Sequence, residues 1–470
     1  NKIVYRLKYL LEVIPIILSK DINENVALRK YQPIADFYNG KSIFITGGTG
    51  FLGKALIEKL LYATNLDKIY VLIRDKKGVD VNTRLENMFE NPLFSRLKDS
   101  KPSSFDKVVP VRGDIELPNL GISQQDEKTL IEKVSVVFHS AATIMLHQPL
   151  PVTMNTNFEG TKRILNLTKR MRNIEAFVHT STAYCHPNRP VLHERIYPAP
   201  ATLDDVHHFI KVYGDNPKET KKFVEGSLTT YGFSKAMTEA YIADNHGDVP
   251  TAIVRPSSVS PTASEPLIGW TDNWFASTST FHNCGKGWTL ITLGDENHLA
   301  DSIPVDYVTN LTMIVAARLN RSKKIQVYNC TSSSENPLTW GEAYKCFIDT
   351  MPRFFHLYSK SEMVVNLLTI ILQIIPAHIA DVWLRIKGRN PKYVKLMRSV
   401  LIMRNSVLDY TSRSWVFLAD KSVKLYSELS PEDQKSFPCN PADINWPKYL
   451  KDYCNGIFKY LKPKFTARDQ

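Results

Sequence analysis

The chain has few cysteines for its length, and they are widely spaced. Six occur in 470 residues, and no two of them form a C-x-x-C pair. Structural zinc sites and disulfide-stapled domains need closely spaced sets of cysteines. The spacing therefore argues against both kinds of site, so we expect no metal centre, and it is typical of a protein from a reducing compartment. The positions are Cys185, Cys284, Cys330, Cys346, Cys439 and Cys454.

Long uninterrupted hydrophobic runs are also missing. The most apolar stretch, Val364–Ile375, is interrupted by Asn366 and Gln373 and followed by Pro376, whereas a membrane span needs roughly 20 apolar residues. We expect a core helix or an interfacial segment rather than a true span. A cluster of basic residues follows closely, which favours an anionic membrane surface. These are Lys387, Arg389, Lys392, Lys395 and Arg398.

Basic residues are in excess, yet they lack the pattern typical of nucleic-acid binding. The formal net charge is +12, from 59 basic and 47 acidic residues, without an Arg-rich repeat or a stripe of alternating basic and aromatic residues. We therefore expect no nucleic-acid partner, and favour a phosphorylated cofactor or an anionic membrane surface. The alternative is that most of the excess consists of scattered solubilising lysines.

Length and composition predict two or three domains. Residues 1–33 contain an amphipathic helix broken at Pro15, and Glu12 interrupts its apolar residues, so we expect no secretory signal. From residue 34 to about 350, short apolar runs alternate with helical stretches. Beyond that point, in residues 351–470, the strand-like runs thin out and helical, Trp- and Lys-rich sequence continues. We expect an N-terminal segment, a nucleotide-binding domain and a helical C-terminal domain with these bounds.

The alternation in the middle region predicts an α/β fold. Continuous apolar runs are typical of strands that helices cover on both faces, and hence of a doubly wound, Rossmann-type parallel sheet, here with a smaller substrate-side region. The predicted strands are residues 42–46, 69–73, 108–111, 134–139, 176–180 and 251–254, and the clearest helices are 52–62 and 158–171.

A G-x-x-G-x-x-G pattern follows the first predicted strand and opens a helix. Such glycines let the backbone turn tightly and approach the pyrophosphate of a dinucleotide, whose charge the helix N-terminus stabilises. The alternative is an ordinary glycine-rich turn. The predicted cofactor-binding residues of this loop are Gly47, Thr49, Gly50, Phe51, Leu52 and Gly53.

The end of the second strand bears on the choice of dinucleotide. An acidic residue there would bind a ribose hydroxyl, whereas an arginine would accept a 2′-phosphate. Arg74 and Arg84 favour NADPH, while Asp75 leaves NADH open. Later strand ends add Asp114, whose carboxylate could accept from the adenine amino group, with Ile115, and the small residues Ala141 and Ala142; each could equally be turn or core sequence.

Tyr231 and Lys235 lie four residues apart, on one face of a predicted helix. A phenol ionises near pH 10 in water. A neighbouring cation favours the phenolate, so we expect Lys235 to lower the pKa of Tyr231 and to hold the cofactor ribose as well. The pair suits a reductase that protonates an oxygen while hydride arrives at carbon. Alternatively, the two residues lie on a helix by chance and have no catalytic role.

A hydroxyl for the substrate carbonyl is predicted at the end of the fifth strand. Thr182 or Ser181 would face the ligand crevice there, and we favour Thr182 from its place in the Thr-Ser-Thr run. Either side chain could instead only cap the following turn.

Together, these motifs resemble the extended short-chain dehydrogenase/reductases and, more narrowly, the eukaryotic fatty acyl-CoA reductases, particularly the insect type. The resemblance runs from about residue 34 to 462. Pro256, in Arg255-Pro256-Ser257, completes the predicted cofactor-binding residues. The other segments that carry it are Ile45–Gly53, Val71–Arg74, Gly269–Asn273, Ile303–Asp306, Gly388–Pro391, Trp415–Phe417 and Ile444–Tyr449.

The resemblance implies reduction of a long-chain acyl-CoA to a primary alcohol through a bound aldehyde, with two hydrides from NADPH and release of CoA. It also implies a membrane-associated, cytosol-facing enzyme, with the endoplasmic reticulum expected and the peroxisome or lipid droplet as alternatives; a homo-oligomer is possible. No cysteine lies in a nucleophile-like setting, so no acyl-enzyme is needed. Departures at Ser258, Ile268 and residues 274–277 leave the chain-length preference open. Alternative functions are a reductase that stops at the aldehyde or acts on a sterol or other carbonyl, and a silent lipid- or nucleotide-binding scaffold.

Overall fold

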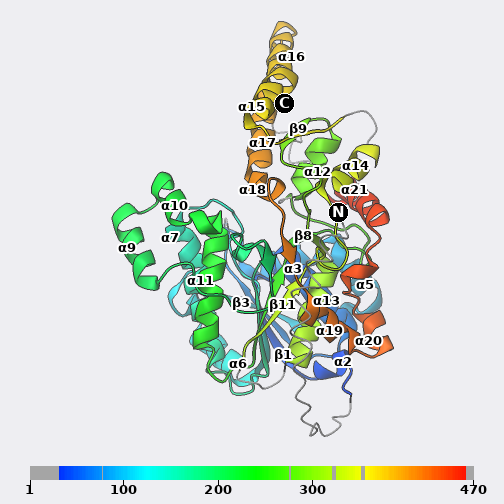
Figure 1. Cartoon of the computed structure of the whole chain (residues 1–470). Helices are drawn as coiled ribbons and strands as arrows, with labels where there is room; N and C mark the ends of the chain where they lie inside the picture. Colours follow the sequence, from blue (N-terminus) through cyan, green and yellow to red (C-terminus); the bar gives the residue numbers. More distant parts are fainter. Residues whose placement is uncertain (1–30, 77, 275–276, 320–323, 351–354, 462–470) are drawn as a thin grey trace, which may run out of the picture. The chain divides into compact units, whose positions relative to one another are not determined.

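The structure is a computed structural model that describes residues 31–76, 78–274, 277–319, 324–350 and 355–461 (Figure 1). The predicted N-terminal helix lies outside the described residues. Residues Ile34–Gln470 belong to one unit. The proposed division of this unit near residue 350 stays a prediction.

A seven-stranded, wholly parallel sheet forms the centre of this unit, in the order β11-β7-β5-β4-β1-β2-β3. The order reverses between β1 and β4, which is the switch point where doubly wound sheets bind ligands. All six predicted strands are present, so the α/β prediction is confirmed. The strands are β1 (Ser42–Thr46), β2 (Ile69–Ile73), β3 (Val108–Arg112), β4 (Val134–His139), β5 (Ala176–Thr180), β7 (Thr251–Pro256) and β11 (Gln326–Cys330).

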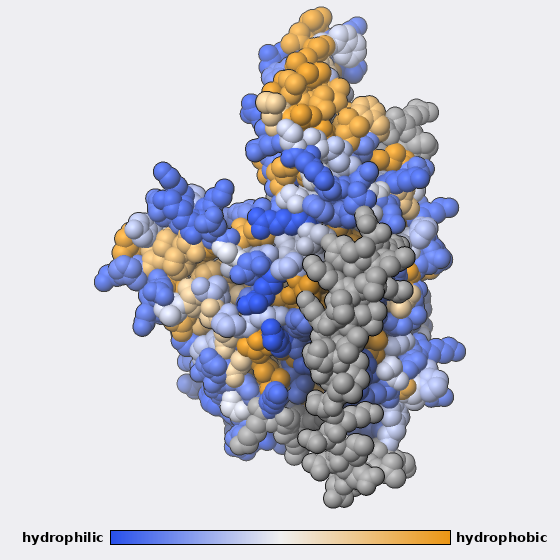
Figure 2. Space-filling model, in the orientation of Figure 1, coloured by the Kyte–Doolittle hydropathy of each residue, from blue (hydrophilic) through white to orange (hydrophobic). Residues whose placement is uncertain are grey.

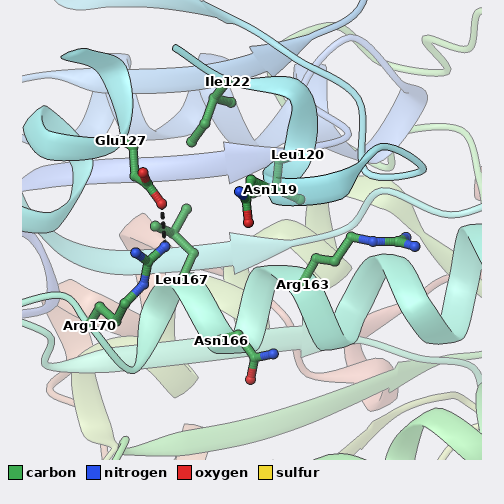
Figure 3. Close-up of a pocket in the computed structure, with 8 residues that line it drawn as sticks. All are labelled: Asn119, Leu120, Ile122, Glu127, Arg163, Asn166, Leu167 and Arg170. Carbon is green, nitrogen blue, oxygen red and sulfur yellow. Dashed lines mark hydrogen bonds and ion pairs between the residues drawn. The ribbon is translucent and has the colours of Figure 1, made fainter. Parts of the chain in front are cut away.

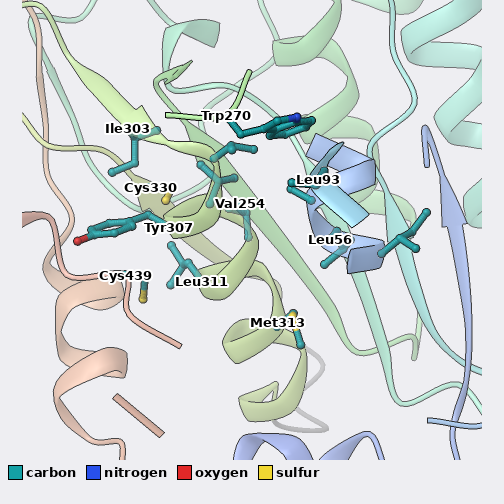
Figure 4. Close-up of a cluster of buried hydrophobic side chains, with 14 of the residues drawn as sticks. Leu56, Leu93, Val254, Trp270, Ile303, Tyr307, Leu311, Met313, Cys330 and Cys439 are labelled. Carbon is teal, nitrogen blue, oxygen red and sulfur yellow. The ribbon is translucent and has the colours of Figure 1, made fainter. Parts of the chain in front are cut away.

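Helices cover both faces of the sheet, so its central strands are buried on both sides (Figure 1). Alternate residues of one strand point to opposite faces: Ile43 and Ile45 pack with helices α3 and α13, whereas Phe44 packs with α6, α8 and α11. Figure 4 shows part of the larger core, where Leu56 of α3, Leu311 of α13 and Val254 of β7 meet.

The helices begin and end as follows. They are α2 (Ile34–Phe37), α3 (Phe51–Ala63), α4 (Val81–Phe89), α5 (Ser95–Ser100), α6 (Gln124–Lys133), α7 (Leu150–Thr153), α8 (Gly160–Thr168), α9 (Leu203–Tyr213), α10 (Pro217–Phe223), α11 (Thr230–Asn245), α12 (Ser277–Gly285), α13 (Val305–Arg318), α14 (Trp340–Thr350), α15 (Glu362–Thr369), α16 (Ile375–Ile386), α17 (Tyr393–Ser406), α18 (Leu408–Thr411), α19 (Asp420–Ser427), α20 (Pro431–Ser436) and α21 (Trp446–Tyr460). Two π-helical turns, η4 (Met154–Glu159) and η7 (Ile370–Ile374), and short 3-10 turns connect them, among them η3 (Pro118–Gly121), η5 (Ala183–Cys185) and η6 (Glu225–Ser227).

The C-terminal region is tied to the middle of the chain by short strand pairs. β12 (Leu357–Ser359) pairs with β9 (Ile291–Leu293), and β13 (Val416–Phe417) pairs with β6 (Val191–Leu192). A further pair, β8 (Ser258–Ser260) with β10 (Ser302–Pro304), lies within the substrate-side region. Pairing between residues so far apart in the chain fixes the C-terminal region against the middle of the chain.

The apolar stretch near residue 370 forms a longer helix than its sequence predicts. The apolar stretch Val364–Ile375 is followed by Pro376, yet α15, η7 and α16 form one helix over Glu362–Ile386. The helix continues because η7 uses wider turns: Ile375 N–H donates to the carbonyl of Ile370, five residues back. Such a π-bulge accommodates a proline, which has no N–H to donate.

Candidate active site

The glycine loop joins β1 to α3 at the switch point of the sheet. Gly47 has φ +74°, and a Cβ on it would lie 2.7 Å from the backbone nitrogen of Ala141. A Cβ on Gly53 would lie 2.2 Å from the carbonyl oxygen of Gly47. Only glycine fits either position. Gly50 occupies the N-cap of α3 without a side-chain cap, so backbone N–H groups at this helix start are open to an anionic ligand.

The side chains between the glycines serve packing as well. Phe51 stacks on Trp270, with ring centroids 5.1 Å apart, and Leu52 is partly buried against the same core. Thr49 is partly exposed in the loop. The loop is thus held from the side of α3 while its backbone stays accessible, which fits a pyrophosphate.

The basic residues after β2 lie near the end of the neighbouring strand, β3. Arg74 is exposed, and its Nη1 lies 3.3 Å from Oδ2 of Asp114. Arg84 donates to the backbone carbonyl of Arg74, and Asp75 forms an ion pair with Arg112. The carboxylate of Asp75, which left NADH open as the cofactor, is therefore paired with Arg112. Arg74, Arg84 and Asp114 are brought together, as expected of a cofactor-binding group.

The other predicted cofactor residues lie at the strand ends. Ala141 N–H donates to Thr46 Oγ1 over 3.2 Å, and Ala142 follows it, partly exposed. Ile115 is buried against Gly160 of α8. Pro256 is the buried last residue of β7. The two alanines border the glycine loop, whereas Ile115 and Pro256 are part of the packed interior.

Tyr231 and Lys235 lie on the first turns of α11, whose N-cap is Thr229. Thr229 Oγ1 accepts from Gly232 N–H over 2.9 Å, which fixes the start of the helix. Lys235 is buried and donates to the carbonyl oxygen of Thr180, the last residue of β5, over 2.7 Å. The hydroxyl of Thr182 lies close enough to the phenol of Tyr231 to lower its pKa. The three predicted catalytic residues are therefore within one small volume.

The protonation states differ from our expectation for the tyrosine. Burial raises the pKa of Tyr231, and the neighbouring Thr182 hydroxyl lowers it by less. Burial lowers the pKa of Lys235 to about 8, against the negative charge of Glu239. The pKa of Tyr231 is therefore raised overall, against our expectation, because the loss of water around the phenol disfavours the phenolate.

Thr182 and Ser181 have different neighbours. Thr182 Oγ1 accepts from Tyr184 N–H over 3.3 Å, so it also caps the following turn. The predicted alternative, capping, is thus present beside the contact with Tyr231. Ser181 is buried beside the carboxylate of Glu239. Of the two hydroxyls, that of Thr182 is the one that contacts Tyr231.

A buried ion pair holds α11 against the sheet. Arg255 of β7 donates to both carboxylate oxygens of Glu239, through Nε over 2.9 Å and through Nη2 over 2.5 Å, and both side chains are fully buried. Cys185 and His186 lie near the same carboxylate. Because the guanidinium occupies both oxygens and burial raises the pKa of the Cys185 thiol, this group is an ion-pair network rather than a metal site.

Two functional neighbours were missed by sequence reasoning. Glu239 continues the four-residue spacing of Tyr231 and Lys235, a signal that was available. Asn157, buried in η4, accepts from Thr143 N–H over 2.8 Å, and its amide donates to Ser234 Oγ over 2.9 Å. It joins the segment after Ala142 to α11, and no pattern in a single sequence marks it.

A pocket of about 90 Å³ lies elsewhere, between α6, η3 and α8 (Figure 3). Glu127 and Arg170 form an ion pair across it. None of the predicted site residues lines it, so it is distinct from the strand-end site. Its lining is Asn119, Leu120, Ile122, Glu127, Arg163, Asn166, Leu167 and Arg170.

Solved structures share this fold over nearly the whole chain. The terminal R domain from the myxalamid PKS-NRPS biosynthetic pathway has a TM-score of 0.65 at 19% identity, covering 90% of this chain and 91% of that one. The reductase domain of a nonribosomal peptide synthetase from Mycobacterium tuberculosis has a TM-score of 0.62 at 18% identity, covering 89% and 91%. At these identities the likeness concerns the fold.

Sequence comparisons reach further. An NAD-binding family model and a second model, both described as male sterility protein, match residues 45–312 and 372–463. With the glycine loop, the first match identifies a nicotinamide dinucleotide site. Fatty acyl-CoA reductase 1 of Xenopus laevis is 35% identical over 446 residues, and that of Homo sapiens 33% over 442, each covering 91% of this chain and 86% of the relative. The chain belongs to the fatty acyl-CoA reductase family.

Proposed function

We propose that this protein reduces a long-chain fatty acyl-CoA to the primary alcohol, with NADPH as reductant, through an aldehyde that stays bound. The observation that carries the proposal is the meeting of Thr182, Tyr231 and Lys235 at the carboxyl end of β5. Strand ends at the switch point of such a sheet are where ligands bind. Family membership supports the acyl-CoA substrate.

In the first reduction, the hydroxyls of Thr182 and Tyr231 bind the thioester carbonyl oxygen and stabilise the charge that develops on it. A nicotinamide cofactor held at the glycine loop would supply hydride to the carbonyl carbon. Collapse of the resulting tetrahedral oxyanion breaks the C–S bond and leaves the aldehyde, and the CoA thiolate takes up a proton from solvent. In the second reduction the same two hydroxyls bind the aldehyde oxygen, and the Tyr231 hydroxyl donates its proton to the alkoxide.

The pKa directions fit this role. Because burial raises the pKa of Tyr231, the phenol keeps its proton at neutral pH and is ready to donate it. Lys235, with a pKa of about 8, is placed to return a proton to Tyr231 and to bind the ribose. Burial raises the pKa of all six cysteines, which keeps them as thiols and fits direct reduction without an acyl-enzyme.

Replacing Tyr231 tests the function. Tyr231→Phe removes the proton donor and keeps the ring, so acyl-CoA reduction should fall at least about 100-fold, the lower end of the usual contribution of acid catalysis. NADPH affinity, measured by fluorescence titration, should change by less than about threefold, since the glycine loop is untouched. Retained activity in this variant would refute the assigned role.

The preference for NADPH rests on Arg74 and Arg84 beside an acid, Asp75, that is already paired. Arg74→Ala should raise the KM for NADPH by about tenfold or more, because a charge-assisted bond to the 2′-phosphate is lost, while the KM for NADH stays the same. The matched control is Arg112→Ala, which removes the partner of Asp75. Equal changes for the two cofactors would contradict the assignment.

We also propose that the protein works on a membrane surface, with the helix Glu362–Ile386 lying in the interface. Its most apolar 18-residue window has a mean hydropathy of 2.0, and the helix is long enough to cross a bilayer. Aliphatic side chains recur along one face at helical spacing, and Figure 2 shows them gathered over α15 and α16. The exposed members are Met363, Leu367, Ile370, Ile371, Ile375, Ile379, Val382, Trp383 and Ile386.

The opposite face of this helix is polar and bound to the protein, which favours an interfacial position over a span. Thr369 accepts from Arg404 over 2.7 Å, and Gln373 donates to the carbonyl of Trp288. Asp381 accepts from three N–H groups at the start of α17, including Tyr393 N over 2.8 Å. A span would require these polar contacts to break, whereas an interfacial helix buries only its apolar face.

Vesicle flotation tests this arrangement. Ile379→Glu/Ile386→Glu should abolish binding to vesicles that contain phosphatidylserine, and the nearby basic residues should make binding weaken with salt. Val212→Glu, on the exposed face of α9, is the matched control. Equal flotation of all three proteins would contradict the proposed surface.

The free state of all six cysteines supports a cytosol-facing location, and a lipid-soluble substrate and product favour the endoplasmic reticulum membrane. Cell fractionation distinguishes it from the peroxisome and the lipid droplet.

A further inference from the structure

A segment of the C-terminal region lies against the proposed catalytic residues. After α18, Trp415 Nε1 donates to the carbonyl of Pro187 over 2.9 Å, and β13 then pairs with β6. These contacts anchor the chain directly after residues 412–414. They bring Tyr410, the third residue of α18, to the part of the reductase region that holds Thr182 and Tyr231.

Tyr410 contacts two segments at once. Its ring packs edge-on against Tyr184, with centroids 5.0 Å apart and an interplanar angle of 89°. It packs in the same cluster as Leu228, the residue before Thr229, and its hydroxyl lies close enough to the Thr229 side chain for that side chain to lower its pKa. Tyr184 lies two residues after Thr182, and Thr229 is the N-cap two residues before Tyr231. Tyr410 thus bridges the two segments that carry the proposed catalytic hydroxyls.

The turn before α11 needs such support. Leu228 has φ +59°, in the left-handed region that a bulky side chain avoids, and it packs in the same cluster as Tyr410, Trp415 and Phe417. A strained residue of this kind persists only where its surroundings hold it. Aromatic residues from the C-terminal region therefore hold the start of the catalytic helix in a conformation that its own sequence disfavours.

We propose that Tyr410 is a positioning residue: it fixes the separation of the Thr182 segment and the start of α11, so that the two hydroxyls meet at one oxygen atom. The inference rests on the proposed roles of Thr182 and Tyr231. It gives the C-terminal region a part in catalysis, since the bridge comes from outside the reductase region. Tyr410 acts through Tyr184 and Thr229, and its phenol lies close enough to that of Tyr231 to affect its ionisation.

Variants of the full chain test the bridge. Tyr410→Leu removes the ring and the hydroxyl, and should lower kcat for acyl-CoA reduction by about 10- to 100-fold, the range expected when reacting groups are misplaced by up to about 1 Å. Tyr410→Phe keeps the ring but lacks the hydroxyl, and should recover about half of this loss on a logarithmic scale, which leaves kcat lowered by about 3- to 10-fold. The KM for NADPH should change by less than about twofold, because the glycine loop is not involved.

The matched control is Tyr426→Phe. The hydroxyl of Tyr426 donates to the backbone carbonyl of Gln434, in the C-terminal region but away from the candidate site. This variant should leave kcat unchanged. A second readout is coupling: in a Thr182→Val background, Tyr410→Leu should lower kcat by less than threefold, since there is no longer a hydroxyl to align.

The outcomes separate this inference from the proposed function. Unchanged kcat in Tyr410→Leu, or an equal further loss in the Thr182→Val background, would overturn the positioning role even if Tyr231→Phe is inactive. Activity in Tyr231→Phe would refute the proposed function instead. Should Tyr410→Leu not fold, Tyr410→Phe decides: a fall in kcat of about threefold or more with unchanged thermal stability supports positioning, and an unchanged kcat overturns it.

Discussion

Lys235 shows most clearly how burial changes the meaning of a residue. From the sequence alone it is a cation that lowers the pKa of Tyr231. In the structure it is buried beneath Thr180, with a pKa of about 8, while the pKa of Tyr231 is raised. The spacing of the two residues could be read from the sequence, but the direction of the pKa shift could not, because it depends on the loss of water around both groups.

The shifted pKa of Lys235 predicts a pH dependence. Below pH 8 the amine of Lys235 is protonated and can return a proton to Tyr231. Above pH 8 that proton is lost, so kcat/KM should fall as the pH rises through about 8. This parameter reports the ionisations of the free enzyme. A pH–rate profile that stays flat from pH 7 to 9.5 would contradict the assignment.

The same shift predicts an effect on stability. The folded-state pKa of about 8 lies below the ordinary 10.5, so the fold bears the cost of a buried charge below pH 8, and the cost is relieved between pH 8 and 10.5. Lys235→Met should therefore stabilise the fold at pH 7 by about 1–3 kcal/mol, less any loss from the unpaired Thr180 carbonyl. Urea denaturation at pH 7 and pH 10 measures it, and the gain should shrink at the higher pH. An equal effect at both values would show that the charge is not the cause.

At the scale of elements, helix α11 carries three polar side chains of the candidate site. Tyr231, Lys235 and Glu239 occupy one face at four-residue spacing, and Glu239 binds Arg255 of β7. The Arg255-Pro256-Ser257 motif, which carried part of the family resemblance in the sequence, thus has a structural role here: its arginine fixes α11 to the sheet.

This ion pair predicts a large asymmetry between single and double replacements. Arg255→Met leaves the buried Glu239 charge unpaired and should lower the free energy of unfolding by about 3–5 kcal/mol. Arg255→Met/Glu239→Met should recover most of that loss. Lys424→Met, which breaks the exposed pair Lys424–Glu428, is the control and should cost less than about 0.5 kcal/mol. Denaturant unfolding measures all three. A double variant no more stable than the single one would contradict the account.

Elements of the sheet were the easiest to predict. Six strands and the helix after the glycine loop follow from continuous apolar runs and from the glycines themselves. β11 was missed because Gln326, Tyr328 and Asn329 make its run too polar to stand out, although three of its residues are fully or almost fully buried. The helix through Pro376 was missed because its π-turn depends on the geometry of the backbone rather than on residue type.

At the scale of the whole molecule, the C-terminal region is built into the reductase. Its last helix, α21, crosses the Gly269–Asn273 segment so closely that a Cβ on Gly456 would lie 1.8 Å from the carbonyl oxygen of Gly269. Tyr449 of the same helix donates to the carbonyl of Pro261 over 2.7 Å. The C-terminal motifs carried part of the family resemblance. These contacts show that Tyr449, in the motif Ile444–Tyr449, and Gly456 pack against the segments that contain Pro261 and Gly269.

This crossing predicts a strong effect from a single methyl group. Gly456→Ala should lower the free energy of unfolding by about 2–4 kcal/mol, because two backbones would have to separate. Gly226→Ala is the control: open space surrounds it, and it should change stability by less than about 0.5 kcal/mol. Thermal unfolding that is equally affected by the two changes would show that the crossing is not tight.

Long-range relations of this kind were outside the reach of the sequence. Nothing in the spacing of Tyr410 and Tyr231, or of Gly456 and Gly269, indicates that they meet, because the contacts arise from packing between distant segments. The motifs were visible one by one, and their assembly required the structure.

The central claim, reduction of an acyl-CoA to the alcohol, is tested most directly by a stoichiometric product assay. The full chain is incubated with NADPH and palmitoyl-CoA, and oxidised cofactor, free CoA and lipid products are measured together. The account predicts two molecules of NADPH oxidised for each CoA released, with hexadecanol as product and no free aldehyde. One NADPH for each CoA, with hexadecanal accumulating, would contradict it.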